Sequence, residues 1–193
     1  MDEFKKLAAG YFRPVIERYH LDLIEEKSFW LDYGNSRVLL RLAYDARRTR
    51  EVVASIAPLY DSGDPYYRFG FELALILRYK NAAEQVRNAA VGSHEVEDEL
   101  RCRSGLIAKY CGKLLDGDLK EFEGLEEYGR RIAHEYTQQG QMRSATVRAG
   151  WALAAGDLGK VVRELTPHEN LLDQAWTNKL IAARRAVGRK KQP

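Results

Sequence analysis

The sequence predicts an α+β fold: an N-terminal helix and a small antiparallel β-meander, packed on a C-terminal all-helical part. Three observations predict it. Apolar residues in the first twenty positions recur every three or four residues, as in an amphipathic helix. Between residues 28 and 57 the period changes to two, as in strands with one buried face. After Pro65 it returns to three and four. We therefore expect a three- or four-stranded sheet, followed by helices only.

The opening helix is predicted to run from Phe4 to Tyr19, because its apolar positions share one helical face. Pro14 should start, kink or divide this helix, since proline has no amide proton for a helix interior. The segment LDLIEEK, residues 21–27, is a candidate first strand, although it is short and mixed in character.

The meander is predicted from strict alternation of apolar and polar side chains, with turns at Gly34-Asn35 and at DARRTR, residues 45–50. Alternation places one set of side chains in the core and the other set, which includes Trp30, on the outer face. The inward set is predicted to be Phe29, Leu31, Tyr33, Val38, Leu40, Leu42, Tyr44, Val52, Ala54 and Ile56.

The helical part should begin at Asp64-Pro65, a side-chain cap followed by a proline. The next segment is apolar on nearly all sides, which indicates the central helix of the fold. Its residues predicted to be nearly inaccessible are Phe69, Leu73, Ile76 and Leu77. Turn residues predict helix breaks at 91–93, 116–118, 139–140 and 156–157, with Asp118 and Asp157 as helix caps.

The predicted organisation is a helix and sheet in residues 1–60, a helical region in 61–188 packed on them as one continuous domain, and a basic tail in 189–193. The stretch WALAAGDLGKVVRELTP, Trp151 to Pro167, has the layout of a helical hairpin. A repeat array needs three or more matched copies, and this hairpin has only a loose second. It is therefore interpreted as packing.

Composition is that of a soluble globular protein, with 193 residues, 45% hydrophobic and 31% charged. The longest apolar run, FELALIL, is far too short to cross a bilayer, and MDEFKK does not resemble a secretory signal, so we expect a cytoplasmic protein that does not associate with membranes. Cys102 and Cys111 are expected to be buried, reduced thiols on one helix.

Catalytic motifs are incomplete. In HEYTQ, Gln138 stands where a zinc site needs a second histidine after His134. In AAGDLGK, Ala154 replaces the first glycine of a phosphate-binding loop. The four histidines fall in different elements, and no nucleophile has a base at a recognised spacing. We expect no cofactor, no metal and no enzymatic activity, although a site assembled from distant residues would leave no such trace.

Binding residues are predicted at the second hairpin turn. Arg47, Arg48 and Arg50 form a charged turn, and Trp30 is expected on the outer face of the same sheet, so these four are the predicted partner-binding residues. The alternative is that the arginines only keep a sheet edge soluble. Nucleic-acid binding by this hairpin and the basic tail is a further alternative. An RNA-binding sheet would need exposed aromatic residues, and Tyr44 should point inward.

The order of these segments resembles a family of small bacterial proteins without an assigned activity, often encoded among polymorphic toxin and immunity genes. The resemblance is carried by LDLIEEKSFW, the Gly-Asn turn, the charged hairpin, FELALIL and ALAAGDLGKVVRELTP. It implies a cytoplasmic immunity-type protein that binds and neutralises a toxin domain. The segment HENLLDQAW, His168 to Trp176, departs from the family pattern. A generic interaction or scaffold module stays an alternative, and the sequence does not indicate an oligomeric state.

Overall fold

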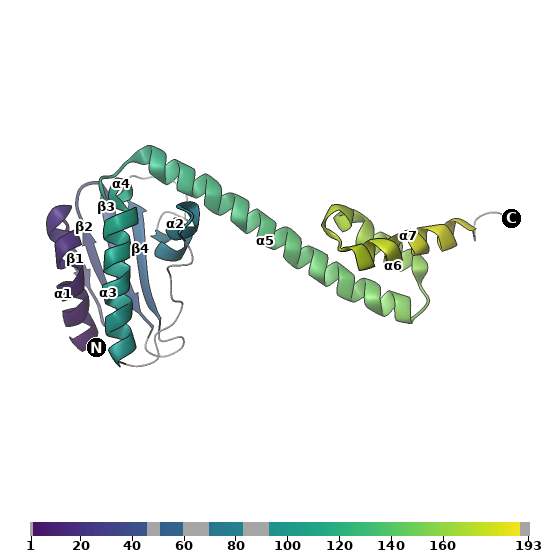
Figure 1. The fold of residues 1–193 in the computed structure, drawn as a ribbon, viewed down its shortest axis with the longest axis horizontal. Coiled ribbons are helices and arrows are strands. Elements are labelled where there is room, and N and C mark those ends of the chain that lie inside the picture. Colours follow the sequence, from purple (N-terminus) through teal and green to yellow (C-terminus); the bar gives the residue numbers. More distant parts are fainter. Residues whose placement is uncertain (1, 46–50, 60–69, 83–92, 190–193) are drawn as a thin grey trace. The chain divides into compact units, whose positions relative to one another are not determined.

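The computed structural model describes residues 2–45, 51–59, 70–82 and 93–189 (Figure 1). The chain forms two compact units, Met1–Gly129 and Arg130–Pro193, called here the N-terminal and C-terminal units. Each is described by itself. The organisation predicted from the sequence, with boundaries at residues 60 and 188 and one continuous domain, stays a prediction.

The N-terminal unit confirms the α+β fold, with a helix, an antiparallel sheet in the order β1-β2-β3-β4-β5, and further helices. Helix α1 continues across Pro14, so the proline does not divide it. The elements are α1 (Asp2–Arg18), β1 (Asp22–Glu26), β2 (Trp30–Gly34), β3 (Val38–Tyr44), β4 (Val52–Pro58), β5 (Phe71–Glu72), α2 (Leu73–Tyr79), α3 (Ser93–Tyr110), α4 (Gly112–Leu115) and the start of α5 (Leu119–Ala154).

The prediction of three or four strands and then helices only was wrong by one short strand. Strand β5 is two residues long and pairs with β4, with Phe71 opposite Ile56. Two residues are too few to show a period, which is why the pattern did not reveal them. Helix α2 then begins at Leu73. The predicted helix start at Asp64-Pro65 and the predicted core residue Phe69 lie outside the described residues.

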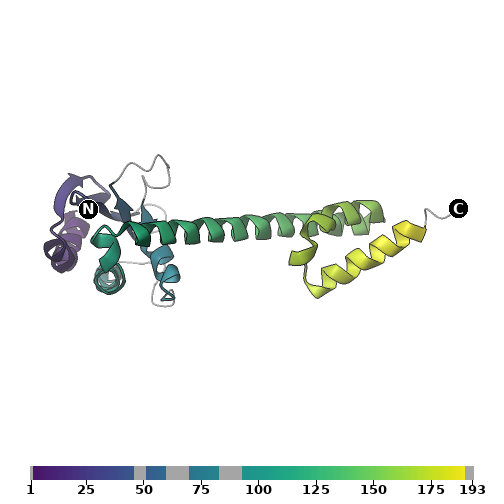
Figure 2. The same cartoon turned by 90° about the horizontal axis from the view of Figure 1, so that it is seen from above.

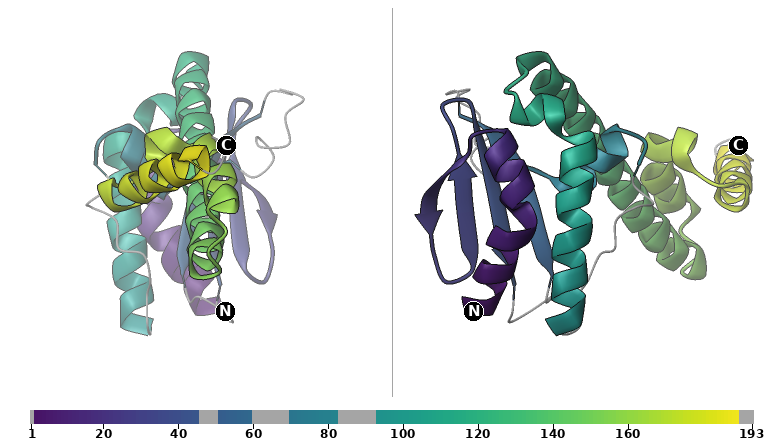
Figure 3. Two further views of the ribbon diagram at one scale, coloured as in Figure 1. Left: turned by 90° about the vertical axis from the view of Figure 1, so that its right-hand side faces the viewer. Right: turned by 60° about the vertical axis from the view of Figure 1, so that its left-hand side comes forward.

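The core of the N-terminal unit lies between the sheet and helices α1 and α3, which run side by side over one face of the sheet (Figures 1 and 3). Tyr44 points into this core, as predicted, and its ring stacks on Phe4 with the centroids 5.4 Å apart. The predicted burial of Leu73, Ile76 and Leu77 is confirmed. The largest fully buried side chains are Phe12, Leu40, Leu42, Ile56, Leu73, Ile76, Leu77, Leu100, Ile107, Leu114, Leu115 and Phe122.

Helix α5 is a single helix of 36 residues, so the break predicted at Gln139-Gly140 was wrong (Figure 2). An interior glycine costs a helix only about 1 kcal/mol relative to alanine, and the residues around Gly140 are compatible with a helix. The turn predicted before α5 is confirmed. Gly117 has a φ of +76°, and Oδ1 of Asp118 accepts a hydrogen bond from the amide of Lys120 at 3.1 Å.

The C-terminal unit contains the end of α5, then α6 (Leu158–Leu165), a 3-10 helix η3 (Thr166–Leu171) and α7 (Gln174–Arg189). The predicted hairpin is confirmed: Gly156 has a φ of +73°, and Asp157 caps α6 by accepting from the amide of Lys160 at 2.9 Å. The small core consists of Ala149, Ala152, Val161, Leu165, Leu180 and Ala183.

Candidate partner-binding surfaces

Of the four predicted binding residues, the structure places one. Arg47, Arg48 and Arg50 lie in residues 46–50, outside the described residues. The strands on either side are described, and Tyr44 at the end of β3 pairs with Val52 at the start of β4. Trp30 begins β2.

Trp30 lies on the outer face of the sheet, as alternation predicted. Its neighbours Leu31 and Tyr33 belong to the core, so Trp30 and Asp32 point to the face opposite α1 and α3. The register of the β2–β3 pair then sets Asp32 directly across from Arg41. Side chains directly opposite in an antiparallel pair are close enough to interact.

A bidentate ion pair joins Asp32 to Arg41. Nε and Nη2 of Arg41 donate to the two carboxylate oxygens of Asp32 at 2.7 Å and 2.6 Å. Asp32 is only 4% exposed, and its hydrogen bonds raise the pKa of Arg41. The paired guanidinium carbon lies 5.4 Å from the centroid of the Trp30 ring. Asp32 thus holds a cation beside the tryptophan.

A second cation and a carboxylate complete the surroundings of Trp30. Nζ of Lys27 lies 5.0 Å from the ring centroid and 2.7 Å from Oε1 of Glu25. The indole N–H of Trp30 donates to Oε2 of Glu25 at 3.3 Å. The hydrogen bond from Lys27, and then that from Trp30, lower the pKa of Glu25. We call Glu25, Lys27, Trp30, Asp32 and Arg41 the Trp30 patch; its own charged groups hold the ring in place.

An exposed isoleucine extends this patch. Ile24 lies at a bulge in β1 and is 57% exposed. Its Cδ1 lies over Gly34, where a Cβ would be 2.7 Å away, so the glycine makes room for this side chain. Gly34 is two residues after Asp32 on β2, so a Cβ on Gly34 would point to the same outer face as Asp32. Ile24, which occupies that position, therefore lies on the same face as the Trp30 patch. The outer face therefore presents apolar, aromatic and charged groups together.

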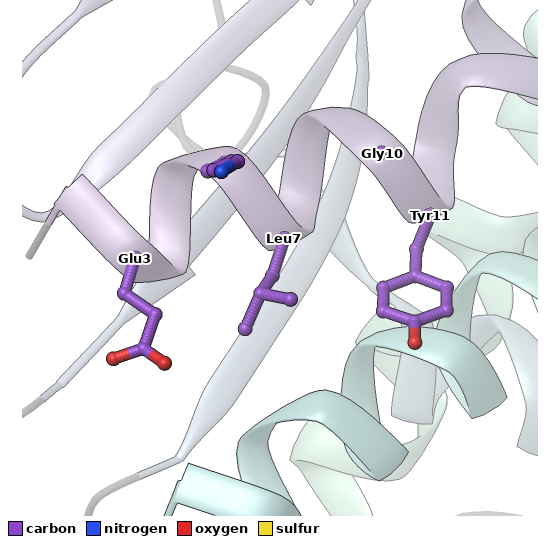
Figure 4. Close-up of a pocket in the computed structure, with 5 residues that line it drawn as sticks. Glu3, Leu7, Gly10 and Tyr11 are labelled. Atoms are coloured by element: carbon purple, nitrogen blue, oxygen red, sulfur yellow. The ribbon is translucent and has the colours of Figure 1, made fainter.

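Two hollows are lined by described residues of the N-terminal unit. One, of about 440 Å³, is lined by Glu3, Lys6, Leu7, Gly10 and Tyr11 of α1 (Figure 4). The hydroxyl of Tyr11 is already engaged, because it donates to Glu97 and accepts from Nη2 of Arg101 at 3.2 Å. This hydroxyl is therefore occupied by a structural network.

The second hollow, of about 240 Å³, lies beside β4, β5 and the start of α2. Its charged lining residues are Glu51, Glu72 and Arg103, and Arg103 pairs with buried Glu99 at 2.8 Å. The described part of the lining contains no histidine, cysteine, serine or threonine. A nucleophile with an adjacent base is therefore not assembled by the described residues in either hollow.

The thiols differ from their prediction. Cys111 is buried, and burial raises its pKa to about 12, which keeps the thiol protonated. Cys102 is exposed on α3, and Cys111 follows the end of that helix. The prediction of two buried thiols on one helix was therefore wrong. Among the described residues, no group of three histidine, cysteine or acidic side chains is arranged to hold a metal. Within the same residues, no helix is long and apolar enough to span a membrane.

The C-terminal unit has a different surface. It carries 12 lysines and arginines against 5 acidic residues, whereas the N-terminal unit carries 19 against 23. Trp151, at the start of the predicted hairpin, is 71% exposed on α5. The exposure of Trp151 could have been predicted from the spacing of Ala145, Ala149 and Ala152. These small residues lie on the buried side of the helix, and Trp151 lies away from that side.

Comparison with known proteins adds no residue to these surfaces. No protein-family model, curated protein or solved structure matches the chain. Function is therefore inferred from the residues themselves.

Proposed function

We propose that the protein is a non-catalytic, immunity-type protein that binds and neutralises a partner toxin domain through the outer face of its sheet. The observation that carries the proposal is the Trp30 patch, in which a tryptophan is fixed by Lys27 and Arg41 on the same sheet face as exposed Ile24. The resemblance of the sequence to a family encoded among toxin and immunity genes supports the toxin as the partner.

The composition of the patch favours a protein partner. Tryptophan and arginine are enriched among the few residues that dominate the binding free energy of protein interfaces. A side chain already fixed in place loses little conformational entropy on binding. Trp30 and Arg41 meet this condition, because buried Asp32 and the carboxylate of Glu25 orient them in the free protein.

The same contacts disfavour nucleic acid at this face. Bases bind protein by stacking on open aromatic rings. The ring of Trp30 already interacts with the cations of Lys27 and Arg41, which a base would have to displace. The edge strand β1 is also bulged between Leu23 and Glu25, which weakens it as a template for an added strand. Contact through side chains is therefore the binding mode that we propose.

The experiment co-expresses the protein with the toxin encoded beside its gene, and measures both survival of the host and the affinity of the purified pair. Trp30→Ala should weaken binding by about 30-fold or more, the size typical of a dominant interface residue. Ile24→Ser tests the apolar part of the patch. Trp151→Ala is the matched control, because it removes the same side chain from an exposed position in the other unit.

Each result has a separate meaning. Wild-type affinity in Trp30→Ala would show that another surface binds the toxin. Binding without protection would favour the alternative of a scaffold or interaction module. Failure of the unmodified protein to bind or protect would reject the immunity function itself.

In this proposal the three predicted arginines of residues 46–50 act on the rate of association through their charge. Peripheral charges at an interface mainly change the rate of encounter and its salt dependence. We propose that replacing Arg47, Arg48 and Arg50 with serine slows association with the toxin and flattens the dependence of the rate on salt. An unchanged association rate would restrict these arginines to keeping the sheet edge soluble.

A further inference from the structure

The C-terminal unit has a strong excess of positive charge. Its 12 basic and 5 acidic residues give a formal charge of +7, while the N-terminal unit has a formal charge of −4. Local excess of one charge sign on a folded unit attracts a partner of the opposite sign and accelerates encounter with it. Most of the acidic side chains of the unit are engaged by groups of the same unit.

Four of the five acidic side chains in this unit are committed to the fold. Glu164 accepts from Nε of Arg148 at 2.7 Å, and Glu169 pairs with Arg184 through two hydrogen bonds of 2.7 Å and 2.8 Å. Oδ1 of Asp157 caps α6, and Oδ1 of Asp173 accepts from the amide of Trp176 at 2.8 Å, which caps α7.

The remaining cations face solvent. Six of them, on α5, α6 and α7, are exposed and form no ion pair with a described carboxylate. Four are arginines, whose planar guanidinium groups match the geometry of phosphate oxygens. These exposed cations are Arg143, Lys160, Arg163, Lys179, Arg185 and Arg189.

Exposed aromatic side chains accompany the cations on α5. Tyr136, Arg143, Val147 and Trp151 follow one another at intervals of seven, four and four residues, so they share one side of the helix. Tyr136 is 61% exposed and Trp151 is 71% exposed. In contrast to Trp30, the ring of Trp151 has no cation over it among the described residues. Its face is open to a stacking partner.

We propose that the C-terminal unit binds single-stranded nucleic acid. The exposed arginines and lysines contact backbone phosphates, and Trp151, with Tyr136 on the same side of α5, stacks on unpaired bases. Open rings beside uncompensated cations are the combination that single-strand binding uses, and stacking tolerates any base sequence. This activity is separate from the proposed toxin binding, because it uses the other unit and other residues.

The test measures binding of a fluorescent oligothymidine of about 15 nucleotides to the full chain by anisotropy, from about 50 to 200 mM salt. We expect a salt-dependent affinity. Arg143, Arg163 and Arg185, one from each helix, are replaced together by glutamine. The slope of log K against log salt should become shallower by about 0.7 for each phosphate contact removed, about 2 in all.

A matched triple variant controls for net charge. Lys6, Arg78 and Lys120 are exposed cations of the N-terminal unit, and their replacement by glutamine removes the same total charge. This variant should bind oligothymidine with the wild-type slope. Equal weakening in both triple variants would overturn the assignment to the C-terminal unit.

Trp151 tests the stacking step. Trp151→Ala should weaken oligothymidine binding by about 5- to 100-fold, and Trp151→Phe should restore most of it, because one stacked base contributes on this scale. A duplex of the same length should bind more weakly than the single strand. Equal affinity for the duplex and no effect of Trp151→Ala would overturn the proposal. So would polyglutamate binding as tight as oligothymidine, which would indicate an acidic protein as the partner.

Discussion

The two units differ in what fills their cores. In the N-terminal unit the fully buried side chains include many large ones, such as Phe12, Phe122 and Leu77, and they come from the sheet and the surrounding helices. In the C-terminal unit three of the six buried core residues are alanines. Stabilisation by burial grows with the apolar area removed from water, at about 25 cal/mol per Å². The larger side chains of the N-terminal unit therefore bury more area per residue.

Small residues in the core of the C-terminal unit bury less apolar area, but they let the helices pack closely. The ring of Trp176 on α7 comes within 3.7 Å of the place that a Cβ on Gly150 would occupy. Partly buried side chains such as Trp176 and Leu172, with ion pairs at the surface, supplement the buried alanines. From this comparison we expect the C-terminal unit to open more readily than the N-terminal unit. Three predictions test the packing of the N-terminal core and then this difference.

The largest effect is expected at the centre of the N-terminal unit. Leu77 is completely buried on α2, so Leu77→Ala should lower the free energy of unfolding by about 2–5 kcal/mol through lost burial and a residual cavity. Denaturant unfolding followed by circular dichroism measures it. Leu119→Ala is the control, because Leu119 is 54% exposed at the start of α5 and should change stability little. Equal stability of both variants would contradict the central place of α2.

The next effect concerns pH. The Cys111 thiol has its pKa raised from an ordinary 9.0 to about 12 by burial, so above pH 9 the unfolded chain loses this proton before the folded protein does. The contribution of the protonated thiol is complete below pH 9 and is lost as pH rises toward 12. At pH 10 the loss of this contribution should lower the free energy of unfolding by about 1 kcal/mol.

Comparison with Cys111→Ala isolates this thiol from the other groups that titrate in the same range. The difference in unfolding free energy between wild type and variant should shift by that amount from pH 8 to pH 10. A constant difference would show that the thiol reaches solvent, and that the core of the N-terminal unit is looser around α4 than described.

The smallest effect compares the two helix caps directly. Asp157→Ala and Asp118→Ala each remove an aspartate cap, at a cost of about 1 kcal/mol. Asp157→Ala should accelerate amide hydrogen exchange in α6 and α7 by about 5-fold and leave β3 and β4 unchanged, because the small core lets its unit open alone. Exchange that accelerates equally in the sheet would show that the two units open together.

Much of the fold followed from local patterns. The caps Asp118 and Asp157, the inward face of the meander from Leu31 onward and the buried side of α2 each depend on a few neighbouring residues, and the structure confirms them. The continuity of α5 did not follow, because the weak helix preference of Gly140 was outweighed by the residues on both sides. Strand β5 depends on pairing with β4, which its two residues do not reveal.

The candidate binding surface was predictable only in part. Alternation placed Trp30 on the outer face, but the ion pair of Asp32 with Arg41 depends on the register of β2 against β3. A two-residue turn at Gly34-Asn35, as predicted, would have set Asp32 opposite Arg37, because the turn fixes which residues lie opposite each other. In the structure the amide of Asn35 bonds to the carbonyl of Val38, so the chain turns two residues later and Arg41 lies opposite Asp32. The excess charge of the C-terminal unit can be counted from the sequence once the boundary at residue 130 is known, but that boundary and the pairing of the acids come from the structure.

The contrast between the two thiols provides a native attachment point for spectroscopic probes. Cys102 is exposed on α3, while Cys111 is buried and protonated. A maleimide fluorophore at neutral pH should therefore couple to Cys102 and leave Cys111 unmodified, because the thiolate is the reactive form and must be accessible. A single dye on α3 would report on the N-terminal unit without any substitution in the chain.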